Sequence, residues 1–251
     1  MTQPFIELKN VKKRFGSNRV MQGVDLLIFK GEITAVIGKS GCGKSVLLKH
    51  IIGLETLDSG VISIAGQDLS AMDREARKRF KQKTSYMFQN NALFDSLNVF
   101  DNIALPLAEG SSLSKKEIRD RVLMRMEQLE IMGIEGRYSA QLSGGMRKRV
   151  ALARALVTDP DVVLFDEPTT GLDPVRKNAV HSMIKAYQER FGFTAVVVSH
   201  EIPEIFEIAQ RVAMLDKGRI VFQGSPEQIK ESTIDVVRSF INGIEETNRE
   251  F

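Results

Sequence analysis

"GEITAVIGKSGCGKS", residues 31–45, is the stretch of sequence that decides the fold. Its first half is a short, continuously apolar run with several β-branched residues, which predicts a buried strand. A glycine-rich turn follows, and the next residues, "KSVLLKHIIG", have the apolar spacing of a helix. A strand, a glycine-rich turn and a helix in this order predict a unit of a parallel α/β domain.

The turn matches the phosphate-loop pattern G-x-x-x-x-G-K-[ST] over residues 38–45. Its glycines allow backbone N–H groups to surround a β-phosphate, Lys44 offers a cation to the β and γ oxygens, and Ser45 offers a hydroxyl to Mg²⁺. Cys42 is the single cysteine, so we expect a small residue that fits the loop rather than a redox sensor. The expected binding residues are Gly38, Lys39, Ser40, Gly41, Cys42, Gly43, Lys44 and Ser45.

The bulk properties of the chain set limits on its class. Its 251 residues and 43% hydrophobic content suit one large α/β domain or a core with an inserted subdomain. The N-terminus lacks the apolar stretch of a signal peptide, and no apolar run approaches the ~20 residues of a transmembrane helix. We therefore expect a cytoplasmic protein that meets a membrane only through a partner. A net charge of +3 does not favour nucleic acid as a partner.

Strand and helix patterns divide the chain into a core and an insertion. Strand patterns occupy residues 5–10, 19–29, 60–66, 84–88, 161–167, 193–200 and 212–224, and the segment from about residue 90 to 157 is helical in pattern. Ser114 and Glu117 have capping-box spacing at the start of one of these helices. We expect a core of residues 1–89 and 158–224, a helical subdomain of residues 90–157, and a C-terminal helical extension of residues 225–251.

"VVLFDEP", residues 162–168, predicts a buried strand that ends in two carboxylates. Ligands bind at the carboxyl ends of such strands. Because adjacent strand residues point to opposite sides, Asp166 is expected to hold Mg²⁺ beside Ser45, and Glu167 to polarise the water that attacks a γ-phosphate. Together with the phosphate loop, this pair predicts a hydrolase.

Three polar residues lie at the ends of other elements and fit the same site. Gln89 ends a strand and is expected to reach Mg²⁺ or the water, and His200 ends another strand and is expected to bind the γ-phosphate. Asp173 follows the acidic strand. Each residue has a structural alternative: a strand-end hydrogen bond for Gln89, a helix N-cap before Pro174 for Asp173, and a loop histidine for His200.

"LSGGMRKR", residues 142–149, is a second anion-binding candidate. Free backbone N–H groups, a helix dipole and basic side chains occur together there. The phosphate loop, about a hundred residues earlier in the chain, is already one such site. The sequence therefore raises the question of why one domain needs two anion-binding sites.

These motifs resemble those of the ATP-binding cassette (ABC) ATPases over nearly the whole chain. The matching elements are the Phe15 region, "GKSGCGKS", Gln89, "LSGG", "VVLFDE", "GLDP" and "SH". The resemblance implies a RecA-like core with an antiparallel β subdomain, an inserted α-helical subdomain, and a head-to-tail dimer that sandwiches two ATP molecules with Mg²⁺. In that dimer Ser143, Gly144 and Gly145 would cap the γ-phosphate held by the other protomer. Phe15 would stack on adenine, or would instead be a core residue between early strands.

Within this family the chain resembles the ATPases of MCE-type (Mla-like) phospholipid transporters. Met146 stands where most members have glutamine. Two further segments, "NNALFDSLNVFDNIALPL" and "VRSFINGI", resemble the corresponding sequences of that branch. The resemblance implies phospholipid traffic between the inner and outer membranes of a Gram-negative bacterium and a peripheral location on the cytoplasmic face of the inner membrane. It implies an MlaE-like integral-membrane permease as partner, with an MCE-domain substrate-binding protein and a STAS-domain protein as further candidates.

The surface that would receive the permease is expected within residues 91–103, with Leu93, Phe94 and Phe100 as apolar contacts unless they pack inside the helical subdomain. Three other functions stay open: an importer ATPase for polar amino acids or another small solute, a non-transport ATPase, and a nucleotide-sensing module without catalysis. The sequence does not indicate which lipid moves or in which direction.

Overall fold

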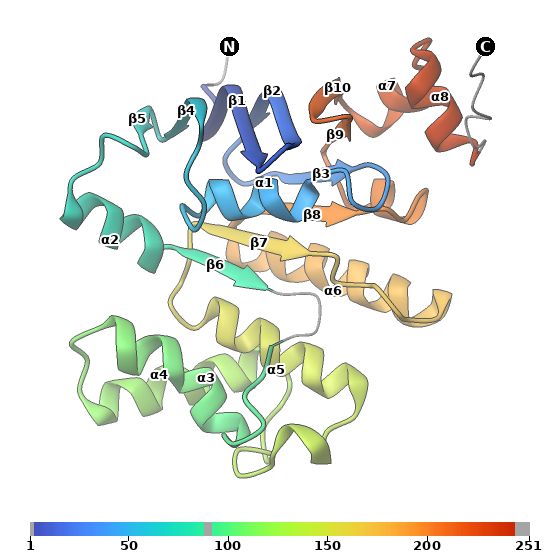
Figure 1. The fold of residues 1–251 in the computed structure, drawn as a ribbon. Helices are drawn as coiled ribbons and strands as arrows, with labels where there is room; N and C mark the ends of the chain where they lie inside the picture. Colours follow the sequence, from blue (N-terminus) through green and yellow to red (C-terminus); the bar gives the residue numbers. More distant parts are fainter. Residues whose placement is uncertain (1–2, 88–91, 244–251) are drawn as a thin grey trace.

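A twisted sheet of six strands forms the centre of the molecule, in the order β10-β9-β3-β8-β7-β6. This computed structural model describes residues 3–87 and 92–243, and Figure 1 shows the sheet between two groups of other elements. The five strands from β9 to β6 are mutually parallel, and β10 pairs antiparallel with β9 in a hairpin. The strands are β3 (Ile33–Ile37), β6 (Thr84–Met87), β7 (Val162–Asp166), β8 (Thr194–Ser199), β9 (Arg211–Asp216) and β10 (Arg219–Gly224).

Apolar clusters cover both faces of this sheet. Side chains alternate between the faces of a strand: Ile33, Ala35 and Ile37 of β3 join one cluster, and Val36 joins the other. Helices α5 (Gly144–Leu156) and α6 (Pro174–Phe191) supply the first cluster, and α1 (Lys44–Ile51) supplies the second. Burial on both faces explains why the central strands β3, β7 and β8 are largely apolar in sequence.

A second, antiparallel sheet of four strands packs over α1. Its order is β2-β1-β4-β5, and its apolar side chains share a cluster with Leu47 and Leu48 of α1. The strands are β1 (Ile6–Phe15), β2 (Asn18–Ile28), β4 (Ser59–Ile64) and β5 (Gln67–Asp68), followed by helix α2 (Arg74–Gln82). The expected core with an antiparallel β sheet is confirmed.

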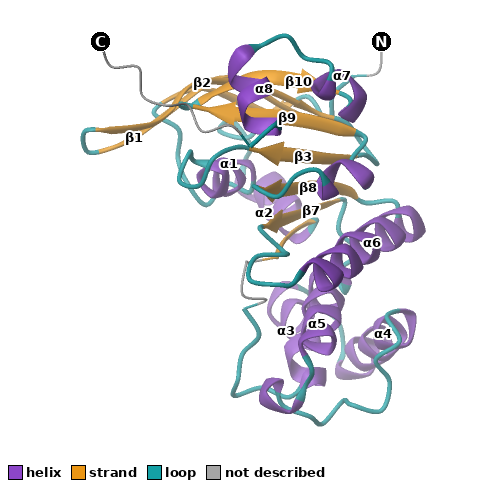
Figure 2. Ribbon diagram, turned by 90° about the vertical axis from the view of Figure 1, so that its right-hand side faces the viewer, coloured by secondary structure: helices purple, strands orange, loops and turns teal. Residues whose placement is uncertain are grey.

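Helices α3 (Val99–Gly110), α4 (Lys115–Gln128) and α5 form a separate lobe. Figures 1 and 2 both show it below the strands, and α5 leads from it back to β7. The capping box at the start of α4 is present: Ser114 Oγ accepts a hydrogen bond from Glu117 N, and Glu117 Oε2 accepts one from Ser114 N. Val122 and Met126 of α4 are fully buried, so these apolar positions, four residues apart, face the core of the lobe.

The chain continues after the β9–β10 hairpin into two short helices, α7 (Pro226–Lys230) and α8 (Asp235–Ile241). Val237 of α8 is fully buried and Ile241 is half-buried against the main core, whereas Ile234 is exposed. The terminal helix therefore covers its own core in part. Ile244, which continues the apolar spacing of Ile234, Val237 and Ile241 in the sequence, lies outside the described residues. Among the described residues, no helix is long and apolar enough to cross a membrane.

The capping box gives a test of the local energetics of the helical lobe. We expect Ser114→Ala to lower the free energy of unfolding by about 1 kcal/mol, because the N–H of Glu117 loses its acceptor at the helix start. Urea denaturation followed by circular dichroism measures this change. Ser112→Ala, an exposed position just before the cap, is the matched control, and equal stabilities of the two variants would contradict the assignment.

Candidate functional site

The phosphate loop joins the end of β3 to the start of α1 and depends on glycines with unusual backbone angles. Gly38 and Gly43 have φ of +156° and +106°, a region that L side chains rarely adopt. Space is also restricted, because a Cβ on Gly38 would lie 2.3 Å from the carbonyl oxygen of Leu215 in β9, and one on Gly43 would lie 2.8 Å from Val20 Cγ1 in β2. The loop is therefore fixed between the two sheets.

Lys44 lies inside this loop and is 4% exposed. Its Nζ donates hydrogen bonds to the carbonyl oxygens of Gly38 (2.9 Å) and Lys39 (3.0 Å). The same Nζ is 3.8 Å from Glu167 Oε1. These contacts hold a positive charge at the centre of the loop, where an anion bound by the backbone N–H groups would meet it.

Ser45 and Asp166 are in direct contact, although 121 residues separate them. Ser45 Oγ donates a hydrogen bond of 2.8 Å to Asp166 Oδ1, and Tyr86 in β6 donates one of 2.7 Å to Asp166 Oδ2. Burial and the neighbouring carboxylate raise the pKa of Tyr86 above its ordinary value, so the phenol stays protonated as a donor. The oxygens of Ser45 and Asp166 are of the type that Mg²⁺ prefers, and they fit that ion.

Glu167 points away from Asp166 toward a different set of groups. Its Oε1 is 3.3 Å from Nδ1 of His200, which follows β8, and its Oε2 accepts a hydrogen bond of 2.9 Å from Thr170 Oγ1. The two carboxylates diverge as predicted, but strand alternation is an incomplete reason. Glu167 lies just beyond β7 with φ of +47°, a left-handed conformation that turns its side chain toward Lys44 and His200.

Two other expected residues lie at exposed helix starts. Ser143 is the N-cap of α5, where its Oγ accepts from Met146 N, and Asp173 is the N-cap of α6, where its carboxylate accepts from Arg176 N. The N-cap alternative for Asp173 is therefore correct. Gly144 and Gly145 are exposed, with open space where a Cβ would be. Within the described residues, the hydrogen bonds and ion pairs of Lys44 and Ser45 are made to Gly38, Lys39, Asp166 and Glu167, and not to these three residues of the "LSGG" motif.

The basic residues after "LSGG" form hydrogen bonds within their own chain. Arg147 donates to the carbonyl oxygen of Leu142, and Arg149 donates to Leu129 O and Glu130 Oε2 in the helical lobe. Lys148 is buried. These cations are engaged by their own chain, so the exposed anion-binding groups at this end of α5 are the backbone N–H groups and Ser143.

Three expected residues remain to be placed: Phe15, Cys42 and Gln89. Phe15 is 45% exposed at the end of β1, with Lys13 Nζ 5.0 Å from its ring centroid, so the alternative of a core phenylalanine is wrong. Cys42 is half-buried and packs against the apolar cluster around α1, and burial raises the pKa of its thiol. Its surroundings agree with a small residue that fits the loop. Gln89 lies outside the described residues.

Tyr86 and Thr170 are site residues that the motifs did not indicate. Tyr86 is paired in register with Leu164, which precedes Asp166 by two residues and so shares its face of the sheet. A tyrosine three residues before Gln89 was the available signal, but only the register of β6 against β7 identifies its partner. Thr170 belongs to the turn after β7, and the sequence alone does not indicate that its hydroxyl lies beside Glu167.

Comparisons with known proteins agree on one family. A family model described as "ABC transporter" matches residues 21–170. The "Intermembrane phospholipid transport system ATP-binding protein MlaF" of Haemophilus influenzae is 36% identical over 243 residues, which cover 97% of this chain and 92% of that protein. The protein of the same name from Escherichia coli K12 is also 36% identical, over 95% of this chain and 89% of that protein. The "Probable ribonucleotide transport ATP-binding protein mkl" of Mycobacterium tuberculosis H37Rv is 39% identical, over 95% of this chain and 66% of that protein.

Solved structures give the same result for the fold. CbiO1 from Clostridium perfringens, described as part of the ABC transporter complex cbiONQ, has a TM-score of 0.83 at 25% identity, covering 94% of both chains. The ATP-binding cassette MJ0796, in a dimeric post-hydrolysis state bound to ADP and Pi, has a TM-score of 0.75 at 30% identity, covering 88% of this chain and 98% of that one.

The close contact at Gly38 gives a test of how the phosphate loop is fixed. We expect Gly38→Ala to lower the melting temperature by several degrees, because its Cβ would collide with the backbone of β9. Gly41→Ala is the matched control: Gly41 also has positive φ, but no atom lies within 4 Å of the added Cβ. Differential scanning calorimetry without ligand compares the two, and an equal or larger loss for Gly41→Ala would contradict the steric argument.

Proposed function

The chain belongs to the ABC transporter family and is an ATPase, and on this premise we propose that it powers phospholipid transport between the inner and outer membranes through a separate permease. The observation that carries the ATPase part of this proposal is the convergence of three groups at one edge of the sheet. These are Lys44 in the phosphate loop, the hydrogen-bonded pair of Ser45 and Asp166, and Glu167 beside His200.

Each group has a role in hydrolysis. The phosphate loop and Lys44 would hold the β- and γ-phosphates of ATP, and Ser45, Asp166 and Gln89 would hold Mg²⁺, which supplies neutralisation of phosphate charge when bound. Glu167 would accept a proton from the attacking water, because its carboxylate lies beside the phosphate-binding cation. His200, 3.3 Å from Glu167, would donate a hydrogen bond to the γ-phosphate, and Phe15 would stack on adenine.

We assign the exposed start of α5 to a second copy of the chain. ABC cassettes form dimers, and a head-to-tail pair would bring Ser143, Gly144 and Gly145 of one protomer to the γ-phosphate held by Lys44 of the other, with Asp173 near the same interface. ATP would close the pair only as far as it binds the closed form better. A shift from 1:99 to 99:1 needs about 5.5 kcal/mol of preference.

Phospholipid is the substrate we favour, for two reasons. The MlaF proteins, whose name gives phospholipid transport, match this chain over nearly their full length. The mkl protein, whose name gives ribonucleotide transport, is slightly more similar per residue, but this chain spans only 66% of it. A ribonucleotide is therefore the second candidate. For a phospholipid system, the location would be the cytoplasmic face of the inner membrane, with MCE-domain and STAS-domain proteins as further partners.

The permease would contact the helical lobe along α3. Phe94, just before this helix, is 51% exposed. Leu93 and Phe100 are half-buried against the lobe's core, so the packing alternative holds in part for these two. Helix α3 has 12 residues and is therefore about 18 Å long. A permease helix of similar length laid along it would reach from Phe94 to the far end of α3.

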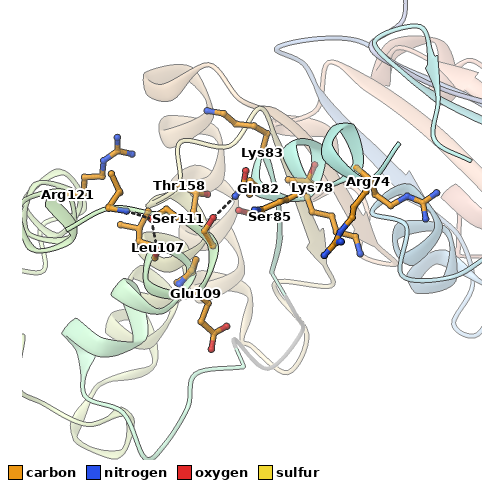
Figure 3. Close-up of a pocket in the computed structure, with 16 residues that line it drawn as sticks. Arg74, Lys78, Gln82, Lys83, Ser85, Leu107, Glu109, Ser111, Arg121 and Thr158 are labelled. Atoms are coloured by element: carbon orange, nitrogen blue, oxygen red, sulfur yellow. Dashed lines mark hydrogen bonds between the residues drawn. The ribbon is translucent and has the colours of Figure 1, made fainter. Parts of the chain in front are cut away.

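A basic cleft of about 800 Å³ opens at that far end, between α2 and the segment that joins α3 to α4. Figure 3 shows Gln82 of α2 reaching across it toward the end of α3, where its Nε2 donates to the carbonyl oxygen of Gly110. One carboxylate, Glu109, lines the cleft against six cations: Arg74, Arg77, Lys78, Lys81, Lys83 and Arg121. Within the described part of the chain, Arg74, Lys78 and Lys81 form no ion pair. This charge fits an acidic end on the permease helix.

Complementation between two inactive variants tests the composite site. Chains with Lys44→Ala and chains with Ser143→Arg each form homodimers without an intact site, whereas a mixed dimer keeps one complete site. Random pairing makes half of the dimers mixed, each with one intact site of two, so we expect the ATPase rate to rise clearly above that of either variant, to at most about a quarter of the wild-type rate. Unmixed variants measured at the same total concentration are the control. A mixture no more active than its components would argue against the head-to-tail arrangement.

Copurification from membranes tests the substrate and the docking surface together. We expect the chain to retain a permease and an MCE-domain protein with bound phospholipid, identified by mass spectrometry. Lys78→Glu/Lys81→Glu should reduce retention at least several-fold, since it reverses charge in the cleft. Lys115→Glu/Lys116→Glu, the same charge change at exposed positions outside the cleft, should leave it unchanged. Recovery of a nucleotide or polar-solute permease without an MCE partner would overturn the phospholipid assignment.

A further inference from the structure

Lys148 connects the helix that begins at "LSGG" to the strand end that carries Glu167. It lies on the second turn of α5, three residues after Gly145, and is 7% exposed. Its Nζ donates a hydrogen bond to the carbonyl oxygen of Pro168. Pro168 directly follows Glu167, so a single hydrogen bond joins α5 to the peptide next to the catalytic carboxylate of the same chain.

The segment after Glu167 is sensitive to such a contact. Glu167 has φ of +47°, and a non-glycine residue keeps this conformation only where its surroundings hold it. The next residues are held by side chains: Thr169 Oγ1 donates 2.6 Å to Glu201 Oε2, and Glu201 also pairs with Lys177 of α6 at 2.7 Å. Together with the bond from Lys148, these contacts hold the segment that directly follows Glu167.

The environment of Lys148 indicates that its position is specific. Burial lowers the pKa of its ammonium, and no carboxylate within the described residues forms an ion pair with it. Burying a cation without such a partner is unfavourable, whereas its neighbours Arg147 and Arg149 reach less buried acceptors in the helical lobe. Lys148 is the basic residue of this cluster that crosses to the core.

We propose that Lys148 is a positioning residue that couples the "LSGG" end of α5 to Glu167 of its own chain. The proposal rests on the dimer and on the role of Glu167 proposed above. Lys148 follows the N-cap Ser143 by five residues, about 7 Å along a rigid helix. A displacement of α5 when Ser143, Gly144 and Gly145 engage the partner's γ-phosphate therefore moves the hydrogen bond to Pro168. ATP in one composite site would in this way adjust the catalytic carboxylate of the other.

The first test is the homodimer of Lys148→Met, assayed in the complex with its permease. We expect kcat to fall on the order of 10-fold or more, because small displacements of a catalytic group cost large factors in rate, while KM for ATP changes less than about twofold. Lys148→Arg, which keeps a cationic donor, should restore part of kcat. Arg149→Met removes a charge from the next residue without touching the Glu167 segment, and should retain near wild-type kcat.

The decisive test places the variant in one chain of a mixed dimer, purified through two different tags. In the first dimer, Lys148→Met is in the chain with intact Glu167 and the partner carries Glu167→Gln. In the second, both substitutions are in the same chain and the other chain is wild type. Both dimers have identical composition and a single catalytic Glu167. We expect the first to be the slower by about the factor lost in the homodimer.

Either of two other outcomes would overturn the proposal. Equal rates would show that Lys148 has no specific effect on Glu167 of its own chain. A slower second dimer would show that Lys148 acts on the α5 end that caps the partner's ATP. The dimer of wild type with Glu167→Gln tests the premise separately: full wild-type activity there would contradict the role of Glu167 itself. If Lys148→Met lowers the melting temperature too far for purification, Lys148→Gln takes its place in the same pair of dimers, with the same expected order of rates.

Discussion

The hydrogen bond from Ser45 to Asp166 is the contact on which the organisation of the site depends. It joins α1, which begins at the phosphate loop, to the end of β7, which is the neighbour of β8 in the central sheet. Because Asp166 is also held by Tyr86 of β6, three elements that are remote in sequence are fixed at one edge. The parallel direction of β3, β8, β7 and β6 is what brings their carboxyl ends there.

The two carboxylates at the end of β7 face different groups and are suited to different roles. Asp166 ends its strand on the face that α1 covers, and its oxygens are used by hydroxyl donors. Glu167 has left the strand in a left-handed conformation and faces Lys44 and His200 instead. Asp166 is suited to a metal ion and Glu167 to a water molecule. Strand alternation and the left-handed backbone of Glu167 together produce this difference.

Much of the fold and the central site could be predicted from sequence, because the signals are local. The phosphate loop is one uninterrupted motif with a strand before it and a helix after it, and the capping box at Ser114 uses two residues three positions apart. The strand that ends in Asp166 is otherwise apolar, because both of its faces are buried.

What could not be predicted depends on contacts between remote segments: Tyr86 with Asp166, Lys148 with Pro168, and the backbone angle of Glu167. The acceptors of Lys148 and Arg149 could not be predicted for the same reason, since they lie in other segments of the chain. The exposure of Phe15 was left open by the sequence and decided by its place at the end of β1, whereas Gln89 stays a prediction.

The capped starts of α5 and α6 have a consequence for the cost of separating two protomers. Ser143 and Asp173 accept hydrogen bonds from the first turns of their own helices. A separated protomer therefore keeps these helix ends capped by its own side chains, and the exposed glycines return to water without leaving a cavity in a core. In the proposed dimer, the starts of α5 and α6 would therefore not need to refold each time the protomers associate and separate.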